Sequence, residues 1–191
     1  PVPLPAPRAL AAAQSLQERR AAREMSVSLA KRFQSLSFKD EARFHHSATE
    51  ALNAAARLAR VNTGKPLLVA FGSGAHGWAD GLAPYGVALG EERYACDVLT
   101  LREMSSATLK VLRVRCDEIA AVLVNPVQGL LATEVKSFGR WLRELRATCT
   151  RVGVPLILDE SGTGFRLGIS GAQGFFGVLA DMVCYGGASA H

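Results

Sequence analysis

Three short groups of residues have types and spacing suited to holding a small charged ligand. Asp159 directly follows the apolar run 156–158, and a carboxylate at the end of a strand can pair with a protonated ring nitrogen. Ser47, Ala48 and Thr49 open a helical pattern, where free backbone N–H groups and side-chain hydroxyls attract an anion such as phosphate. Both groups also have an ordinary explanation, because Asp caps turns and Ser caps helices without any ligand.

The third group is the glycine-rich turn at residues 72–77, which contains His76. Glycines allow a backbone to come close to a planar ligand, although a simple tight turn uses the same residues. His45, His46 and His191 have no metal-ligand spacing relative to any cysteine, so the sequence predicts no metal site.

The elements that must position these groups alternate between strands and helices. Short apolar runs predict strands at 42–45, 67–71, 119–124, 156–158 and 181–185. Helical patterns cover 9–34, 47–60 and 134–152, with a capping-box spacing at Ser47 and Glu50 and with Gly64 and Gly153 as stops. Because the strand runs are mostly apolar throughout and are separated by helices, we predict an α/β fold of three layers with a mostly parallel sheet. Ligands bind beyond the carboxyl ends of such strands, where all three groups lie.

The chain is expected to comprise two parts, an N-terminal helical arm over 1–34 and a larger domain over 35–191. Residues 1–8 alternate proline with other residues, which favours an extended backbone, and an Arg-rich helix follows. A length of 191 residues with 49% hydrophobic content is enough for one domain with a sizeable core.

Charge and cysteine usage narrow the classes of function. The net charge is +5, but no basic stripe with interleaved aromatic residues occurs, so the sequence predicts no nucleic-acid partner. The four cysteines are widely spaced in apolar runs, which predicts free thiols and a reducing compartment. The apolar runs are too short for a transmembrane helix.

The beginning of the chain has two interpretations, and the sequence leaves both open. The first residue is Pro1, and the segment after the Pro/Ala-rich arm is rich in arginine and poor in acids. These features fit the mature end that remains after a targeting peptide is removed, and they fit an arbitrary start equally well.

Taken together and in order, these groups resemble class III aminotransferases, and within them the glutamate-1-semialdehyde aminomutase-like branch. The matching stretches are 43–51, 55–60, 76–77, 119–129, 156–166 and 171–181. The resemblance implies a truncated version of the large domain of fold-type I pyridoxal-phosphate (PLP) enzymes, which are normally dimers. It also implies that Ser47, Ala48 and Thr49 face the cofactor phosphate and Asp159 the pyridine nitrogen, with His76 completing the cofactor-binding residues.

Several positions depart from the family pattern. The lysine that bonds covalently to the cofactor is replaced by Gly187, and the glycine between Ser and Thr is replaced by Ala48. The two residues that usually pack on the cofactor ring are replaced by Ala75 and Ser161, and a conserved family acid is replaced by Asn125. The resemblance therefore implies a vestigial site with no catalytic residue, in which no cofactor is expected unless the site is intact enough to hold PLP.

These departures favour a non-catalytic aminotransferase-like subunit, or pseudoenzyme, with a structural or accessory role in a larger assembly. Its partners would be protein subunits in an organelle, a chloroplast or a mitochondrion, with the cytoplasm as the alternative and a peripheral position on a membrane complex allowed. One alternative function is a fragment of an active aminotransferase or aminomutase whose lysine comes from another chain. The other is a non-covalent binder of a phosphorylated ligand at Ser47, Thr49 and Asp159.

Overall fold

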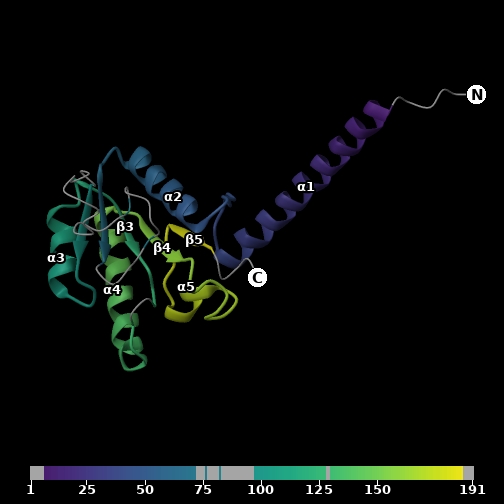
Figure 1. Ribbon diagram of the computed structural model, residues 1–191. Helices are drawn as coiled ribbons and strands as arrows, with labels where there is room; N and C mark the ends of the chain where they lie inside the picture. Colours follow the sequence, from purple (N-terminus) through teal and green to yellow (C-terminus); the bar gives the residue numbers. More distant parts are fainter. Residues whose placement is uncertain (1–6, 72–75, 77–81, 83–96, 128–129, 187–191) are drawn as a thin grey trace, which may run out of the picture. The chain divides into compact units, whose positions relative to one another are not determined.

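The computed structural model describes residues 7–71, 76, 82, 97–127 and 130–186 (Figure 1). The chain divides into two compact units, Pro1–Arg43 and Phe44–His191. The boundary predicted from the sequence, between residues 34 and 35, stays a prediction.

The first unit is built on one long helix, α1 (Pro7–Ser37). This confirms the helix predicted over 9–34. The extended arm predicted over 1–8 is wrong at residues 7 and 8, because the fixed φ angle of a proline is compatible with the first turn of a helix. Residues 1–6 lie outside the described part. Along the helix, Met25, Val27 and Leu29 expose their apolar side chains.

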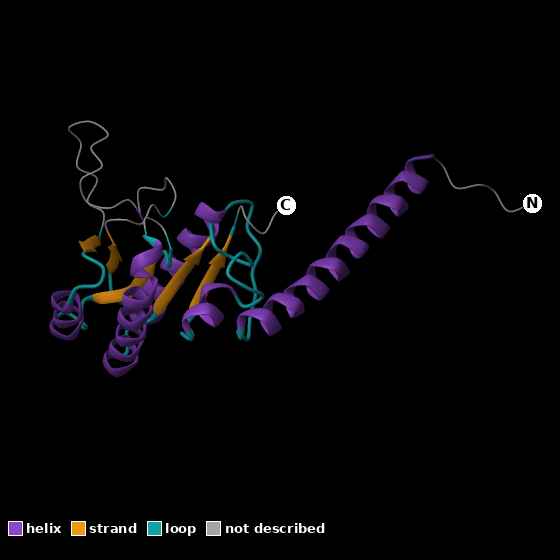
Figure 2. Cartoon of the chain, turned by 90° about the horizontal axis from the view of Figure 1, so that it is seen from below, coloured by secondary structure: helices purple, strands orange, loops and turns teal. Residues whose placement is uncertain are grey.

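The second unit is built on a sheet of five parallel strands, which Figure 2 draws as orange arrows. The strands are β1 (Leu67–Phe71), β2 (Val98–Leu101), β3 (Ile119–Val124), β4 (Leu156–Glu160) and β5 (Met182–Tyr185), in the spatial order β2-β1-β3-β4-β5. The predicted α/β fold with a parallel sheet is confirmed. β1 and β3 have the predicted bounds, whereas β4 extends two residues further because Asp159 and Glu160 pair in register with Cys184 and Tyr185.

Helices cover both faces of the sheet and complete three layers (Figure 1). α2 (Ala48–Thr63) packs on one face, mainly against β3 and β5. α3 (Ser106–Val114), α4 (Val135–Val152) and α5 (Gly171–Phe176) contribute to the apolar cluster on the other face, and a short 3-10 turn (Ala132–Glu134) precedes α4. We call these two sides of the sheet the α2 face and the α5 face.

Helix α2 has the predicted cap at Ser47 and the predicted stop at Gly64, but it extends to Thr63 rather than ending at residue 60. The Ser47 hydroxyl accepts a hydrogen bond from the Glu50 amide at 3.2 Å, and the Glu50 carboxylate accepts one from the His46 amide at 2.9 Å. Gly64 ends the helix with φ +68°, a left-handed conformation that glycine adopts without strain. α4 likewise ends at Gly153 with φ +69°.

Two parts of the sequence prediction need correction, and a third is not tested. Residues 42–45 are not a strand, because a strand requires a partner and the described sheet has no sixth member beside them. β2 and the helices α3 and α5 were not predicted. The glycine-rich turn at 72–77 lies outside the described residues except for His76.

A rigid aromatic core lies behind the sheet on the α5 face. Trp141 of α4 packs edge-on against Phe71 of β1, with ring centroids 5.2 Å apart, and also against Phe138.

At the amino ends of β4 and β5, Asp181 accepts bonds from Arg146 at 2.6 Å and from the Leu156 amide at 2.7 Å. These contacts fix β4 and β5 relative to each other, so their carboxyl ends have defined positions.

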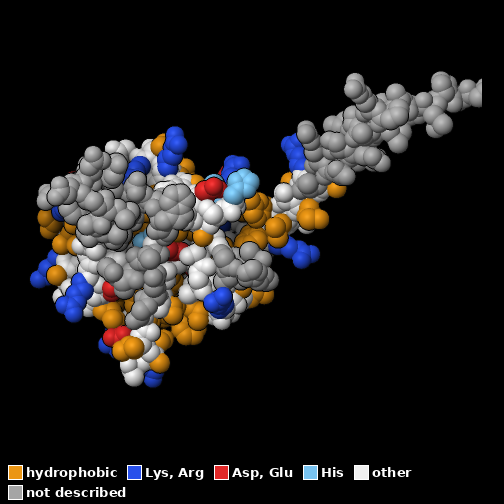
Figure 3. Space-filling view, in the orientation of Figure 1, with side chains coloured by type: hydrophobic (Ala, Val, Ile, Leu, Met, Phe, Trp, Pro, Cys, Tyr) orange, Lys and Arg blue, Asp and Glu red, His pale blue; other side chains and the backbone are white. Residues whose placement is uncertain are grey.

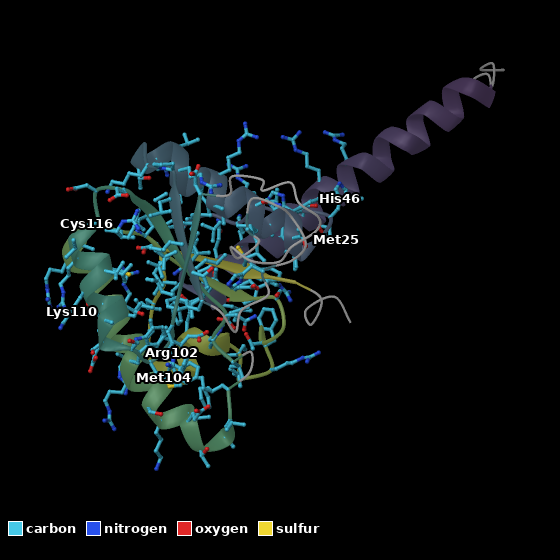
Figure 4. All side chains as sticks on the ribbon, turned by 60° about the vertical axis from the view of Figure 1, so that its left-hand side comes forward. Met25, His46, Arg102, Met104, Lys110 and Cys116 are labelled. Atoms are coloured by element: carbon cyan, nitrogen blue, oxygen red, sulfur yellow. The ribbon has the colours of Figure 1, made fainter. Side chains whose placement is uncertain are left out.

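The remaining surface features concern cysteines, charge and membrane contact. Cys149 and Cys184 are buried free thiols and Cys116, labelled in Figure 4, is partly buried, while Cys96 lies outside the described part. Lys and Arg side chains are scattered over the coloured part of the face in Figure 3 rather than gathered in one stripe. Within the described ranges no helix has the length and apolar character to cross a bilayer, and no three potential metal ligands cluster.

Candidate functional site

The carboxyl end of β4 presents two consecutive carboxylates to opposite sides of the sheet. Side chains alternate along a strand, and Ile157 belongs to the apolar cluster on the α2 face whereas Leu158 belongs to the one on the α5 face. Asp159 therefore points to the α2 face and Glu160 to the α5 face. Both side chains are fully buried.

On the α2 face, Asp159 pairs with His76, which lies 83 residues earlier in the sequence. His76 Nδ1 and Asp159 Oδ2 are 2.8 Å apart, and both side chains are 0% exposed. An ionised carboxylate only accepts hydrogen bonds, so beside ionised Asp159 the ring must carry a proton on Nδ1. The other oxygen, Oδ1, accepts a bond from the Ser161 amide at 3.0 Å.

This pair still has unused hydrogen-bonding capacity. Two carboxylate oxygens accept about four hydrogen bonds, and the described partners of Asp159 supply two. His76 Nε2 is buried and has no hydrogen-bond partner among the residues that the structure describes. Buried polar atoms are costly unless they are paired, so this point of the sheet is suited to receive one further polar group.

The start of α2 meets the same region through Gly186. A Cβ atom placed at Gly186 would overlap the Ala48 methyl and would lie 3.1 Å from the Ser161 Cβ. The first turn of α2, the residue after β4 and the residue after β5 therefore converge, and only glycine fits at position 186. Ser47 is exposed with its hydroxyl engaged in the cap, whereas Thr49 is half-buried in the first turn.

The thiol of Cys184 lies close to the point where Ala48, Ser161 and Gly186 meet, but it is not reactive. Its Sγ donates to the Ala51 carbonyl at 3.7 Å, which holds it under α2. Burial, reinforced by the negative charge of Asp159, raises the pKa of Cys184 to about 12. The thiol stays protonated at neutral pH, so it contributes packing rather than a nucleophile.

Two predicted departures from the family pattern, Ala75 and Gly187, lie outside the described residues. The described lysines of the second unit have other positions. Lys65 precedes β1 and donates to the Cys116 carbonyl at 2.8 Å, at the opposite end of the strands from Asp159. Lys110 lies on α3, far across the unit from His46 at the start of α2 (Figure 4), and Lys136 is exposed on α4.

On the α5 face, Glu160 is a buried carboxylate to which the sequence alone assigned no role. Its Oε2 accepts a hydrogen bond from the Ala172 amide at 2.8 Å. Burial raises the pKa of Glu160, and hydrogen bonding to backbone amides of α5, that of Ala172 first, offsets part of that rise. The other carboxylate oxygen, Oε1, has no hydrogen-bond partner among the described residues. Burial and the nearby Glu160 charge also raise the pKa of Tyr185 to about 12.

The sequence pointed to Asp159 on the α2 face of the strand but not to Glu160 on the α5 face. The structure brings His76 and Asp159 into direct contact, and it links Ala48 to Ser161 through Gly186. Asn125, the residue in place of the family acid, accepts a bond from the Val127 amide at 3.4 Å and so shapes the turn after β3. The signal that could have revealed Glu160 is a second acid following an apolar strand.

Comparison with known proteins agrees with this architecture. The model of the family "Aminotransferase class-III" matches residues 8–191. Glutamate-1-semialdehyde 2,1-aminomutase from Desulforapulum autotrophicum is 36% identical over 161 residues, which cover 77% of this chain and 37% of that protein. The chain thus spans less than half the length of the curated relatives it matches.

Solved structures show the same fold. An omega-transaminase from Sphaerobacter thermophilus superposes with a TM-score of 0.74 at 27% identity, covering 85% of this chain and 41% of that one. A structure described as a transaminase with PLP bound superposes with a TM-score of 0.69 at 27% identity, covering 84% of this chain and 40% of that one.

Proposed function

The chain belongs to the class-III aminotransferase family, and on this basis we propose that it is a non-catalytic member that holds a pyridoxal-type ligand without a covalent bond. The observation that carries the proposal is the buried pair of His76 and Asp159 at the carboxyl end of β4. The pair is kept although the sequence has Gly187, and no amine, at the family's lysine position.

The residues fit a protonated pyridine ring. Asp159 is an acceptor with capacity left, and His76 holds it in place with a bond of 2.8 Å. A buried carboxylate next to a pyridine nitrogen stabilises the protonated ring, and the cofactor supplies an electron sink in that state when it is bound. In this chain the pair would bind and orient the ring, and His76 would keep the carboxylate from turning away.

The site offers fewer groups for binding the phosphate than for binding the ring nitrogen. The Ser47 hydroxyl already caps α2, and the Ala48 methyl packs against Gly186 where the family has no side chain. The amides of Ala48 and Thr49 at the start of α2 remain to attract an anion. We therefore expect most of the affinity to come from the ring nitrogen.

A ligand that already carries its own amine suits such a site. Without a lysine, the aldehyde form has no nucleophile in this chain at position 187 with which to bond. Pyridoxamine 5′-phosphate (PMP), the amine form, needs none. It is the appropriate probe.

Titration of the purified chain with PMP, followed by calorimetry, tests the proposal. We expect saturable binding that dialysis reverses, and a loss of affinity of about 100-fold in Asp159→Asn, because a buried charge-assisted bond to the ring is removed. Asp117→Asn is the matched control, since Asp117 is exposed at the amino end of β3. Equal affinity in Asp159→Asn and the wild type would contradict the proposal, and so would the absence of binding.

A second candidate function is a structural or accessory subunit of a protein assembly, compatible with a non-catalytic role. It is supported by the exposed apolar side chains of α1, of which Met25 is 72% and Val27 51% exposed. An isolated helix of this kind gains most of its stability from packing on a partner. An organellar location and a peripheral position on a membrane complex stay predictions within this candidate.

A third candidate is a split enzyme in which another chain supplies the lysine. The convergence of Ala48, Ser161 and Gly186 at one point is compatible with it, because the family's lysine position follows directly. Adding PLP to the chain alone and then to the assembly, followed by borohydride, separates this candidate from the first. A stable adduct that forms only in the assembly, on the partner, would favour the split enzyme.

A further inference from the structure

We propose that Glu160 is a positioning residue for the ligand site on the opposite side of the sheet. It anchors the segment that follows β4 to helix α5, and it thereby holds the Ser161 amide against Asp159. The inference deepens the proposed function and rests on it for the identity of the ligand.

The first observation is the way the Glu160 carboxylate is enclosed. It is fully buried, and its Oε2 accepts the Ala172 amide at 2.8 Å, in the first turn of α5. Gly171, the first residue of that helix, has φ +57°, and any Cβ atom there would overlap the carboxylate. Position 171, where α5 lies against the Glu160 carboxylate, is therefore occupied by glycine.

The second observation is that Glu160 also organises the turn after β4 through its backbone. Its carbonyl accepts the Gly164 amide at 2.8 Å and the Thr163 amide at 3.3 Å. Its side chain fixes the far end of the same segment at α5. Both ends of the segment 161–171 are thus attached to a single residue.

The third observation is that the near end of this segment is part of the ligand site. Ser161 is the residue immediately after Glu160, and its amide donates to Asp159 Oδ1 at 3.0 Å. Its Cβ also borders Gly186, together with Ala48. A displacement of the segment would move the Ser161 amide away from Asp159 and change the orientation of the carboxylate that faces the ring.

A further contact holds the segment on the same side. Phe165, in the middle of the segment, adopts φ +62°, which is uncommon for a bulky residue. Its ring stacks on Tyr185 at 5.2 Å, and Tyr185 pairs in register with Glu160 across β4 and β5. The strained backbone is kept where the surrounding contacts determine it, which fits a segment that must keep one position.

The test uses two glycines at the two ends of α5. Gly171→Ala and Gly177→Ala both place a methyl group on a left-handed backbone, at φ +57° and +66°, so both carry similar strain. Only the methyl at position 171 meets the Glu160 carboxylate, because a Cβ at Gly177 has no atom within 4 Å. Gly177→Ala is therefore the matched control.

The first readout needs no ligand. Hydrogen exchange of the Ser161 amide, followed by NMR, is expected to become about tenfold faster in Gly171→Ala, because the bond to Asp159 is weakened. In Gly177→Ala the exchange is expected to match the wild type. Equal exchange of the Ser161 amide in the two variants would overturn the proposal.

The second readout separates positioning from general damage to the fold. Gly171→Ala should bind PMP about tenfold more weakly, while its affinity for an analogue lacking the ring nitrogen should be unchanged. Equal losses for both ligands would show a merely structural role and would overturn the proposal. If Gly171→Ala does not fold, Glu160→Gln is measured in the same way with Glu144→Gln, an exposed residue of α4, as its control.

The same data distinguish a failure of this inference from a failure of the proposed function. If the wild type does not bind PMP but Ser161 exchange still differs between the two glycine variants, the proposed function fails and the positioning role remains. If PMP binds all three proteins equally and Ser161 exchange is equal, the proposed function remains and the positioning role fails.

Discussion

Asp159 and Glu160 are neighbours in the sequence, both fully buried and both at the end of β4, yet they have opposite surroundings. Asp159 faces His76 and the start of α2, and part of its hydrogen-bonding capacity is unused by the described residues. Glu160 faces α5, where its Oε2 accepts the Ala172 amide and its Oε1 has no hydrogen-bond partner among the described residues. Under the proposed function, Asp159 binds a ligand, whereas Glu160 connects β4 to α5.

Under the proposed function, the comparison separates a residue that binds the ligand from a residue that maintains the fold. The resemblance implies that Gly187 stands at the position of the family's lysine. The shape depends on contacts such as those of Glu160 with the Ala172 amide and of Asp181 with Arg146, which remain. Changes that affect one carboxylate and spare the other therefore test the account.

The largest expected effect on stability comes from Glu160→Ala. Removing the carboxylate leaves the buried amides of Ala172 and Gln173 without their acceptor, so we expect the free energy of unfolding to fall by about 3 kcal/mol. Urea denaturation measures the change. Glu118→Ala is the control, because Glu118 is an exposed partner of Arg115 and its loss should leave the urea midpoint unchanged.

A smaller loss of stability is expected for Asp159→Ala, about 1.5 kcal/mol. Without Asp159, the His76 ring can move its proton to the other nitrogen. Because Ser161 is only half-buried, water can also replace part of the hydrogen bonding that its amide loses. The same urea titration gives the value, and the stabilisation of the protein by PMP should disappear in this variant. A loss larger than that of Glu160→Ala would reverse the comparison between the two carboxylates.

Three of the ten described α-helices and β-strands, namely β2, α3 and α5, were not predicted from the sequence. β1, β3 and α4 follow from apolar runs and from one periodic stripe, since burial alone decides them. β2 is only four residues long and half-buried, so its run carries little signal. α3 had a usable signal, because the Ser105 hydroxyl caps it and Leu109 and Leu112 are buried on one side.

The site was predicted in part for the same reasons. Asp159 stands out because it follows an apolar run. Its contact with His76 joins residues 83 positions apart, and only the folded sheet brings them together. The partner of Glu160 is a backbone amide at the start of α5, and no side chain in the sequence marks such a contact.

A moderate effect is expected from the two serines that cap helices on opposite faces. Ser47 caps α2 and Ser105 caps α3, so Ser47→Ala and Ser105→Ala should each cost about 1 kcal/mol in thermal unfolding. If a phosphate lies at the start of α2, only Ser47→Ala will also change the affinity ratio between PMP and its dephosphorylated form. An identical ratio in both variants would place the phosphate elsewhere.

The smallest effect is a dependence of stability on pH. The pKa of Glu160 is raised in the folded state, so its ionised form costs stability once the pH exceeds the ordinary range of a glutamate. This stability is fully present below the unfolded pKa and is lost as the pH rises through the folded pKa. Compared with Glu160→Gln, the wild type should therefore lose melting temperature as the pH rises above the ordinary range of a glutamate. A difference that stays constant with pH would contradict the assigned direction.

The central claim is that this family member keeps the ring-nitrogen side of a pyridoxal site without a covalent anchor. The most direct measurement adds PLP to the chain, reduces with borohydride and maps any modified lysine by mass spectrometry, with and without an excess of PMP. We predict that PMP binds reversibly, that Asp159→Asn weakens this binding about 100-fold, and that no lysine is protected from modification by PMP. A single lysine of this chain that PLP modifies at saturation, and that PMP protects, would contradict the claim.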